Sequence, residues 1–139
     1  MSDKIFIDTN LWVYLYAKEP ENKYLKVQKI IADDFDSIVV STQILGELFY
    51  VLSRKKLVEQ DEAKEIILEI VSNFSINEID TIKVLQALEI NAKYGYSYWD
   101  SLIIATALPT DCITIYSEDM HHEQLIEKKT RIINPFLSA

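Results

Sequence analysis

Segments that would interrupt regular structure or cross a membrane are scarce in this sequence. Its 139 residues include two glycines and three prolines, with no low-complexity run and no internal repeat. Because no glycine- or proline-rich linker divides the chain, we expect a single domain over residues 1–139. No uncharged apolar stretch of about eighteen residues occurs, and no basic region precedes a long apolar run near the N-terminus. We therefore expect a cytoplasmic protein without a membrane span or signal peptide.

Cysteine and positive charge are also in short supply. The single cysteine, Cys112, lies among apolar residues, and we interpret it as a buried packing residue rather than a nucleophile. The net charge of −8 argues against a protein that coats nucleic acid by overall positive charge. It does not exclude a nuclease, because bound divalent cations offset acidic side chains locally. Basic residues gather at 54–56 and 128–131, and each run is either solvated surface or a contact for a phosphate backbone.

Apolar residues make up 49% of the chain, and their spacing predicts alternating strands and helices. Short β-branched runs alternate with longer segments in which apolar residues recur every three or four positions. This order predicts an α/β fold with a central parallel sheet of four to five strands and helices on both faces. We expect strands at 4–7, 37–41, 112–116 and 130–133, a weaker strand at 75–79, and helices at 9–16, 22–33, 43–55, 61–73, 81–93 and 98–108.

Four acidic residues are expected near one edge of the predicted sheet, two of them after strands and two in helices. Asp8 directly follows the first strand, and Asp119 comes within two residues after the strand "CITIYS". Glu47 lies in the helix after the second strand, and Asp100 opens a helix that is apolar on nearly every side. Ligands of open parallel sheets bind outside the carboxyl ends of the strands, so we expect these acids to converge there.

A cluster of this kind needs a partner of opposite charge. Two carboxylates 4 Å apart repel by about 4 kcal/mol at an effective dielectric constant of 20. Mg²⁺ and Mn²⁺ bind oxygen ligands and would remove this repulsion.

Each acid also has an interpretation that needs no metal. Asp8 and Asp119 could cap a following helix, which is a common role for aspartate after a strand. Asp100 has the capping-box spacing from Ser97. Glu47 could point to solvent from the flank of its helix. The sequence leaves both interpretations open for each residue taken alone.

The acids lie in four blocks of sequence, "FIDTNLWVYLY", "STQILGE", "YWDSLIIATAL" and "ITIYSEDMHH". In this order, and over nearly the whole chain, the blocks resemble the motifs of the PIN domain family, especially the VapC-type ribonuclease toxins. The resemblance implies a three-layer α/β/α sandwich and one PIN-like nuclease domain. It also implies a metal-binding and catalytic quartet, Asp8, Glu47, Asp100 and Asp119, with Thr9, Asn10 and Ser117 as supporting residues that hold a ligand or its water.

The resemblance implies a metal-dependent endoribonuclease that is the toxin of a type II toxin–antitoxin pair. Its partners would be an RNA substrate, a cognate antitoxin and a second copy of the chain in a homodimer. Mg²⁺ or Mn²⁺ held by the quartet would activate the attacking water, so neither a protein nucleophile nor a histidine base is required. A non-toxin PIN nuclease in RNA processing, or a catalytically silent nucleic-acid or protein binding module, remains an alternative.

Two other classes with aspartates at strand ends match poorly. A phospho-acceptor signalling domain needs a lysine at the end of its last strand, where "RIINPF" has none. A haloacid-dehalogenase-like phosphatase needs a second aspartate two residues after the first, where this chain has Asn10.

The block after the last acid departs from the family pattern. Related sequences often continue "xxHGQ", whereas here His122 is followed by Glu123, which leaves the path of this loop open. We expect His121 and His122 to contact solvent or substrate rather than a metal.

Aromatic residues cluster just before and within the "YWDSLI" block. Their rings could stack on unpaired RNA bases. We favour packing or a subunit interface, where amphipathic rings are also enriched. The residues are Tyr94, Tyr96, Tyr98 and Trp99.

Overall fold

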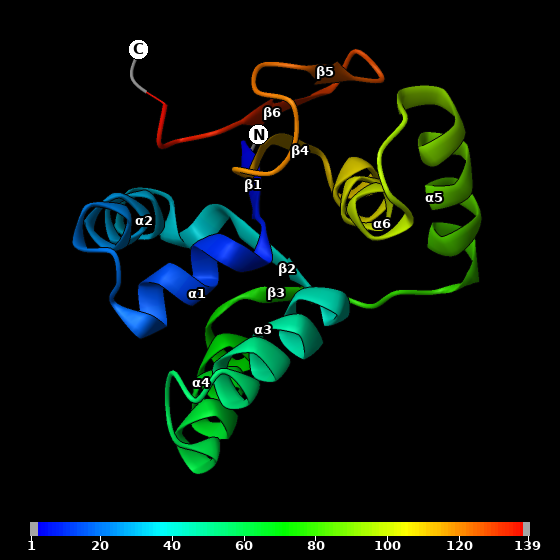
Figure 1. Ribbon diagram of the computed structural model, residues 1–139. Coiled ribbons are helices and arrows are strands. Elements are labelled where there is room, and N and C mark those ends of the chain that lie inside the picture. The colour runs from blue at the N-terminus through cyan, green and yellow to red at the C-terminus, as the bar shows by residue number, and fades with distance from the viewer. Residues whose placement is uncertain (1–2, 138–139) are drawn as a thin grey trace.

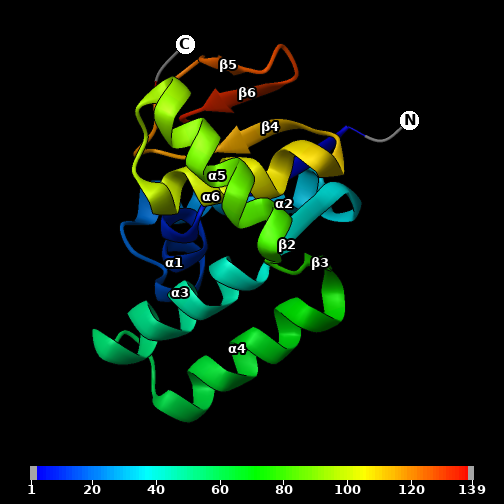
Figure 2. The same cartoon turned by 90° about the vertical axis from the view of Figure 1, so that its right-hand side faces the viewer.

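The computed structural model describes residues 3–137 and contains one six-stranded sheet between helices (Figure 1). The strand order is β3-β2-β1-β4-β6-β5, and every neighbouring pair is parallel except β5 and β6. Helices α1 and α2 lie on one side of the sheet and α5 and α6 on the other, while α3 and α4 project beyond β3 (Figures 1 and 2). The elements are β1 (Lys4–Ile7), α1 (Thr9–Ala17), α2 (Glu21–Asp33), η1 (Phe35–Ser37), β2 (Ile38–Ser41), α3 (Thr42–Arg54), α4 (Gln60–Asn73), β3 (Ser75–Asn77), α5 (Thr81–Tyr94), α6 (Tyr98–Ala107), η2 (Leu108–Thr110), β4 (Cys112–Tyr116), β5 (Leu125–Ile126) and β6 (Thr130–Ile133).

This architecture confirms the predicted fold class and corrects the predicted number of strands in the sheet. All predicted strands and helices are present, with ends that differ by no more than two residues. The sheet has six strands instead of four to five, because the short strand β5 pairs antiparallel with β6. A two-residue strand has too few positions to show an alternating pattern, so its sequence gives no periodic signal.

The most buried elements are β1 and α6. In β1, which pairs with both β2 and β4, Phe6 and Ile7 have no exposed surface. Both faces of such a strand are covered by helices, which explains its unbroken apolar sequence. Residues 101–107 of α6 are all buried, as its all-round apolar pattern predicted. Within residues 3–137, no helix has both the length and the apolar character needed to cross a membrane.

Serine side chains fix the starts of two helices. The Ser41 hydroxyl accepts a hydrogen bond from the Ile44 N–H (3.3 Å) at the start of α3. The Ser97 hydroxyl accepts one from the Asp100 N–H (3.1 Å) at the start of α6. These caps satisfy backbone N–H groups that have no partner within the helix. They therefore set the positions of α3 and α6 relative to the sheet edge.

The loop after β4 includes a backbone conformation that usually favours glycine. Glu123 has a φ of 71°, in the left-handed region. Such a conformation costs a non-glycine residue about 1 kcal/mol. The Glu123 N–H donates to the Ile132 carbonyl (2.6 Å), which holds this loop against β6. The loop therefore keeps a glycine-like turn although the chain has glutamate at this position.

Candidate active site

A cleft of about 1020 Å³ opens at the carboxyl ends of β1 and β2. All four acids singled out in the sequence line it, and so do two of the three residues expected to support them, Thr9 and Asn10. The third, Ser117, is fully buried behind the cleft wall. Four segments that are far apart in the sequence therefore contribute carboxylates to one cavity.

Asp8 is the most buried of these acids. Its side chain is at the end of β1 and the residue is 6% exposed. Oδ1 accepts a hydrogen bond from the Thr9 N–H (2.7 Å), and Oδ2 accepts one from the Ser117 hydroxyl (2.9 Å). Burial raises the pKa of Asp8 to about 7, although both hydrogen bonds oppose this shift and the charges of Asp100 and Glu47 reinforce it. Positive charge near this carboxylate would therefore be strongly favoured.

Glu47 is held on both sides by neutral hydrogen-bond donors. The Thr9 hydroxyl donates to Oε1 (2.5 Å), and the Gln43 amide donates to Oε2 (3.1 Å). The same amide nitrogen donates to the Trp99 carbonyl (3.1 Å), so Gln43 links α3 to the start of α6. Within the described chain, Gln43 Oε1 is buried and has no hydrogen-bond partner. Sequence reasoning gave Gln43 no role, although its position one turn before Glu47 could have indicated this contact.

Asp119 and Asp100 face the cleft from the other side. Asp119 Oδ2 accepts a hydrogen bond from the Asn10 amide (2.9 Å), and the Asp119 N–H donates to Ser117 Oγ (3.2 Å). Burial raises the pKa of Asp100, and the negative charges of Asp119 and Glu47 raise it further. Ser117 therefore connects Asp8 to Asp119, and each predicted supporting residue is hydrogen-bonded to one of the acids.

The interpretations that needed no metal hold only in part. Asp8 is the N-cap residue of α1 and accepts the Thr9 N–H, so it caps a helix and also lines the cleft. Asp119 caps no helix, because the chain after β4 continues through turns to β5. Glu47 does not simply point to solvent, since both of its oxygens accept hydrogen bonds.

The four carboxylates surround the cleft without meeting at one point. Among residues 3–137, no three His, Cys, Asp or Glu side chains are close enough together to hold one metal ion. Mutual repulsion favours this spread, and Asp8, Glu47 and Asp119 each turn toward a donor. The donor set consists of oxygen atoms, which suits Mg²⁺ or Mn²⁺. The chemistry of the residues thus fits a hard divalent cation, and their use as ligands stays a prediction.

Glu118, which sequence reasoning missed, anchors the loop that carries Asp119. The Tyr14 hydroxyl donates to one Glu118 oxygen, and Lys23 Nζ forms an ion pair with the other (2.7 Å). The Lys23 ammonium also lies 5.0 Å from the centres of the Tyr14 and Phe136 rings. These contacts tie the loop to α1 and α2. Neither partner is close to Glu118 in sequence, so only the fold could indicate them.

Both histidines lie outside the cleft lining. The His122 Nδ1 atom accepts a hydrogen bond from the Asn134 N–H (2.9 Å). The His121 ring packs against Tyr96, with 5.4 Å between the ring centres.

The aromatic residues divide into two groups. Tyr96 is buried, and the Tyr94 hydroxyl donates to Glu127 (2.5 Å), so packing and local hydrogen bonding account for these two residues. Tyr98 and Trp99 instead line the acidic cleft, and Trp99 is 61% exposed. Most of the Trp99 surface therefore stays uncovered by the part of the chain that the structure describes.

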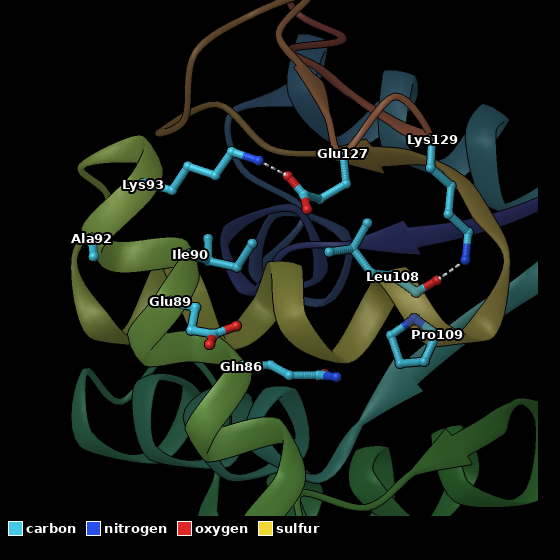
Figure 3. A pocket seen from close by; sticks show the side chains of 9 residues that line it. All are labelled: Gln86, Glu89, Ile90, Ala92, Lys93, Leu108, Pro109, Glu127 and Lys129. Carbon is cyan, nitrogen blue, oxygen red and sulfur yellow. Dashed lines mark hydrogen bonds and ion pairs between the residues drawn. The ribbon is translucent and has the colours of Figure 1, made fainter.

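A second hollow of about 740 Å³ lies between α5, η2 and the turn from β5 to β6 (Figure 3). None of the predicted acids lines it. Lys93 pairs with Glu127 (2.6 Å), and Lys129 donates to the Leu108 carbonyl and pairs with Asp111 (3.2 Å). Its lysines are thus occupied by neighbouring groups, and the basic run at 128–131 lies apart from the acidic cleft.

The PIN domain family model matches residues 5–128, and the chain belongs to this family. No curated protein matches the sequence. Among solved structures, the chain is similar to the toxin VapC20 of Mycobacterium tuberculosis, which cleaves the sarcin–ricin loop (20% identity, 84% of this chain and 90% of that one, TM-score 0.69). It is also similar to a toxin–antitoxin complex from Klebsiella pneumoniae (14%, 96% and 98%, TM-score 0.73) and to DNA-bound VapBC from Salmonella typhimurium (18%, 95% and 97%, TM-score 0.70). The family match confirms the predicted family, and the solved structures confirm the predicted fold.

Proposed function

We propose that this protein is a metal-dependent endoribonuclease that hydrolyses phosphodiester bonds of RNA, and that it is the toxin of a type II toxin–antitoxin pair. The observation that carries the proposal is the cleft at the sheet edge, where four separate segments supply Asp8, Glu47, Asp100 and Asp119. Membership of the PIN domain family supports the nuclease activity. The similar solved proteins include an RNA-cleaving toxin and toxin–antitoxin complexes, which supports the biological role.

In this proposal the quartet holds Mg²⁺ or Mn²⁺. When bound, the cation supplies positive charge for the phosphate and lowers the pKa of a water molecule. Thr9 and Gln43 orient the Glu47 carboxylate through the two hydrogen bonds described above. Ser117 and Asn10 hold Asp8 and Asp119 in a fixed relation to each other. The side chains that touch the acids thus orient ligands rather than supply a nucleophile.

The proposal extends to the partners. A cognate antitoxin is expected because several structurally similar toxins were solved as VapBC or toxin–antitoxin complexes. We also propose a homodimer as the functional unit and the cytoplasm, where RNA substrates occur, as the place of action.

The test is cleavage of an end-labelled single-stranded RNA by the purified protein. Cleavage is expected with Mg²⁺ or Mn²⁺, with 5′-phosphate and 3′-hydroxyl products, and should stop in excess EDTA. Asp119→Asn should lower the rate on the order of a hundredfold or more, because it removes a ligand charge. Asp36→Asn, an equivalent change at an exposed aspartate of η1, is the matched control and should cleave like the wild type.

Two results would contradict the proposal. Equal cleavage in EDTA would exclude the metal requirement, and full activity of Asp119→Asn would exclude the quartet. The toxin role is tested separately by inducing each protein in a bacterial host, where the wild type and Asp36→Asn should arrest growth and Asp119→Asn should not. Growth arrest by all three would exclude RNA cleavage as the cause.

A further inference from the structure

The acidic cleft has a second, aromatic wall that the proposed chemistry does not use. Tyr50 and Trp99 line the same cavity as the quartet, and they are 58% and 61% exposed. Large rings with this exposure add little to the core of the described chain. Their position beside the acids therefore calls for a ligand with a flat, apolar part.

Trp99 makes two contacts, one through its ring and one through its backbone. The Tyr98 ring meets it edge to face, with 4.9 Å between centres and planes inclined at 75°. The Trp99 carbonyl accepts a hydrogen bond from Gln43, the residue that also binds Glu47. Since Gln43 contacts both, the backbone that carries the ring is fixed relative to a predicted metal ligand.

One face of α3 carries an acid, a ring and a cation in succession. Glu47, Tyr50 and Arg54 follow at spacings of three and four residues, which places them on the same side of the helix. The Arg54 guanidinium lies 5.7 Å from the centre of the Tyr50 ring. Seven residues of helix separate Glu47 from Arg54 by roughly 10 Å along the axis. A chain that alternates phosphates and bases would meet a cation site, a ring and a positive charge in that order.

We propose that Tyr50 and Trp99 form a stacking subsite for an unpaired nucleobase beside the scissile phosphate, with Arg54 contacting a neighbouring phosphate. This inference rests on the proposed function and assigns the contact with an unpaired base to two rings of the cleft. Paired bases are stacked on each other inside a helix and cannot offer a free face to a ring.

The charge next to the rings favours nucleic acid over a protein surface as the occupant. A nucleotide strand brings phosphates to Arg54 and to the cation expected at the quartet, and it brings a base to the rings between them. An apolar protein patch would leave Arg54 and the cation expected at the quartet without partners of opposite charge. The order of groups on α3 therefore matches a polynucleotide more closely than a second copy of this chain.

The experiment compares binding of two oligonucleotides of about eight residues, an ordinary single-stranded RNA and one of the same length without bases. Ca²⁺ replaces Mg²⁺, so that binding is measured by fluorescence anisotropy without relying on cleavage. The wild type should bind the ordinary RNA roughly five- to a hundredfold more tightly. Trp99→Ala should lose most of this preference while binding the baseless strand as the wild type does, and Trp99→Phe should keep it.

A second readout is tryptophan fluorescence. Trp12 is fully buried and Trp99 is exposed, so quenching by RNA should report Trp99 and disappear in Trp99→Phe. Leu85→Ala, which removes an exposed apolar side chain of α5 outside the cleft lining, is the control and should behave as the wild type.

Equal affinity of the wild type for both strands would overturn the inference, as would an equal loss for both strands in Trp99→Ala. A wild-type dimer that becomes a monomer in Trp99→Ala, with unchanged RNA binding, would overturn it in favour of a subunit contact. Base-dependent binding without cleavage under any metal would refute the proposed function and leave the subsite standing. Equal cleavage of the ordinary RNA and of the strand without bases would refute the subsite and leave the proposed function standing.

Discussion

Replacing Asp8 with asparagine should stabilise the metal-free protein at neutral pH. The pKa of Asp8 rises from 3.8 to about 7 in the folded protein, mainly because the side chain is buried. One pKa unit corresponds to about 1.4 kcal/mol, so ionised Asp8 opposes folding by about 4 kcal/mol at most. Because asparagine has nearly the same shape and carries no charge, Asp8→Asn removes the free-energy cost of burying an ionised carboxylate.

The sign of the effect depends on pH. Between pH 4 and 7 the folded protein holds a proton on Asp8 that the unfolded chain has already released, so wild-type stability falls as pH rises through this window. The asparagine side chain of the variant would not titrate there. The variant and the wild type should therefore be close in stability near pH 4 and should diverge toward pH 7.5.

The asparagine also loses part of the hydrogen bonding. Asp8 accepts from the Thr9 N–H and from the Ser117 hydroxyl, and an amide can accept with its single oxygen only. This loss costs about 1 kcal/mol. The net gain at pH 7.5 is then about 2 to 3 kcal/mol, which corresponds to about 6 to 9 °C in melting temperature for a chain of this length.

The assay is a series of thermal melts in EDTA from pH 4 to 7.5, with Asp36→Asn as the control at an exposed aspartate. Parallel pH curves for the wild type and Asp8→Asn would refute the reasoning, because they would show that Asp8 does not titrate with a raised pKa. A variant that is less stable at every pH would show that the hydrogen bonds outweigh the burial cost.

Three further predictions concern other residues. Asp100→Asn should stabilise the protein in EDTA by about 0.5 to 2 kcal/mol, seen as a higher melting temperature, because it relieves repulsion in the cleft. Ser97→Ala should destabilise it by about 1 kcal/mol, because the helix cap is lost. If both variants melt at lower temperature than the wild type, Asp100 only supports the cap. Lys23→Met should lower the free energy of unfolding, measured in urea, by about 1 kcal/mol, because it removes the ion-pair partner of the partly buried Glu118. An unchanged free energy would show that the hydrogen bond from Tyr14 alone is enough to stabilise Glu118. Alanines at 54–56 should reduce the slope of log affinity for RNA against log salt concentration, and an unchanged slope would assign this run to plain surface.

The sequence was most informative where local pattern and topology coincide. The apolar run of β1 and the all-round apolar α6 predicted buried elements, and both are buried. The rule that ligands bind at the carboxyl ends of parallel strands brought Asp8 and Asp119 to the same edge, although most of the chain lies between them in sequence.

Contacts between surfaces of different elements could not be predicted in this way. The bond from Gln43 to the Trp99 carbonyl joins residues 56 apart, and its existence depends on how α3 packs near the start of α6. The pair formed by Lys23 and Glu118 likewise depends on where α2 lies against the loop after β4. Hydrophobic periodicity reports which face of a helix is buried but not which polar side chains meet at its margin.

The hydrogen bond from Ser117 to Asp8 joins two positions separated by 109 residues. During synthesis, β1 leaves the ribosome before its neighbour β4, because β2, β3 and helices α1 to α6 lie between them in the sequence. The cleft can therefore close only when the segment around Ser117 has also emerged. In the ribonuclease proposed above, the cleft of a nascent chain would therefore lack one wall until the segment after β4 has been made, which would delay the exposure of the ribosome to the active enzyme.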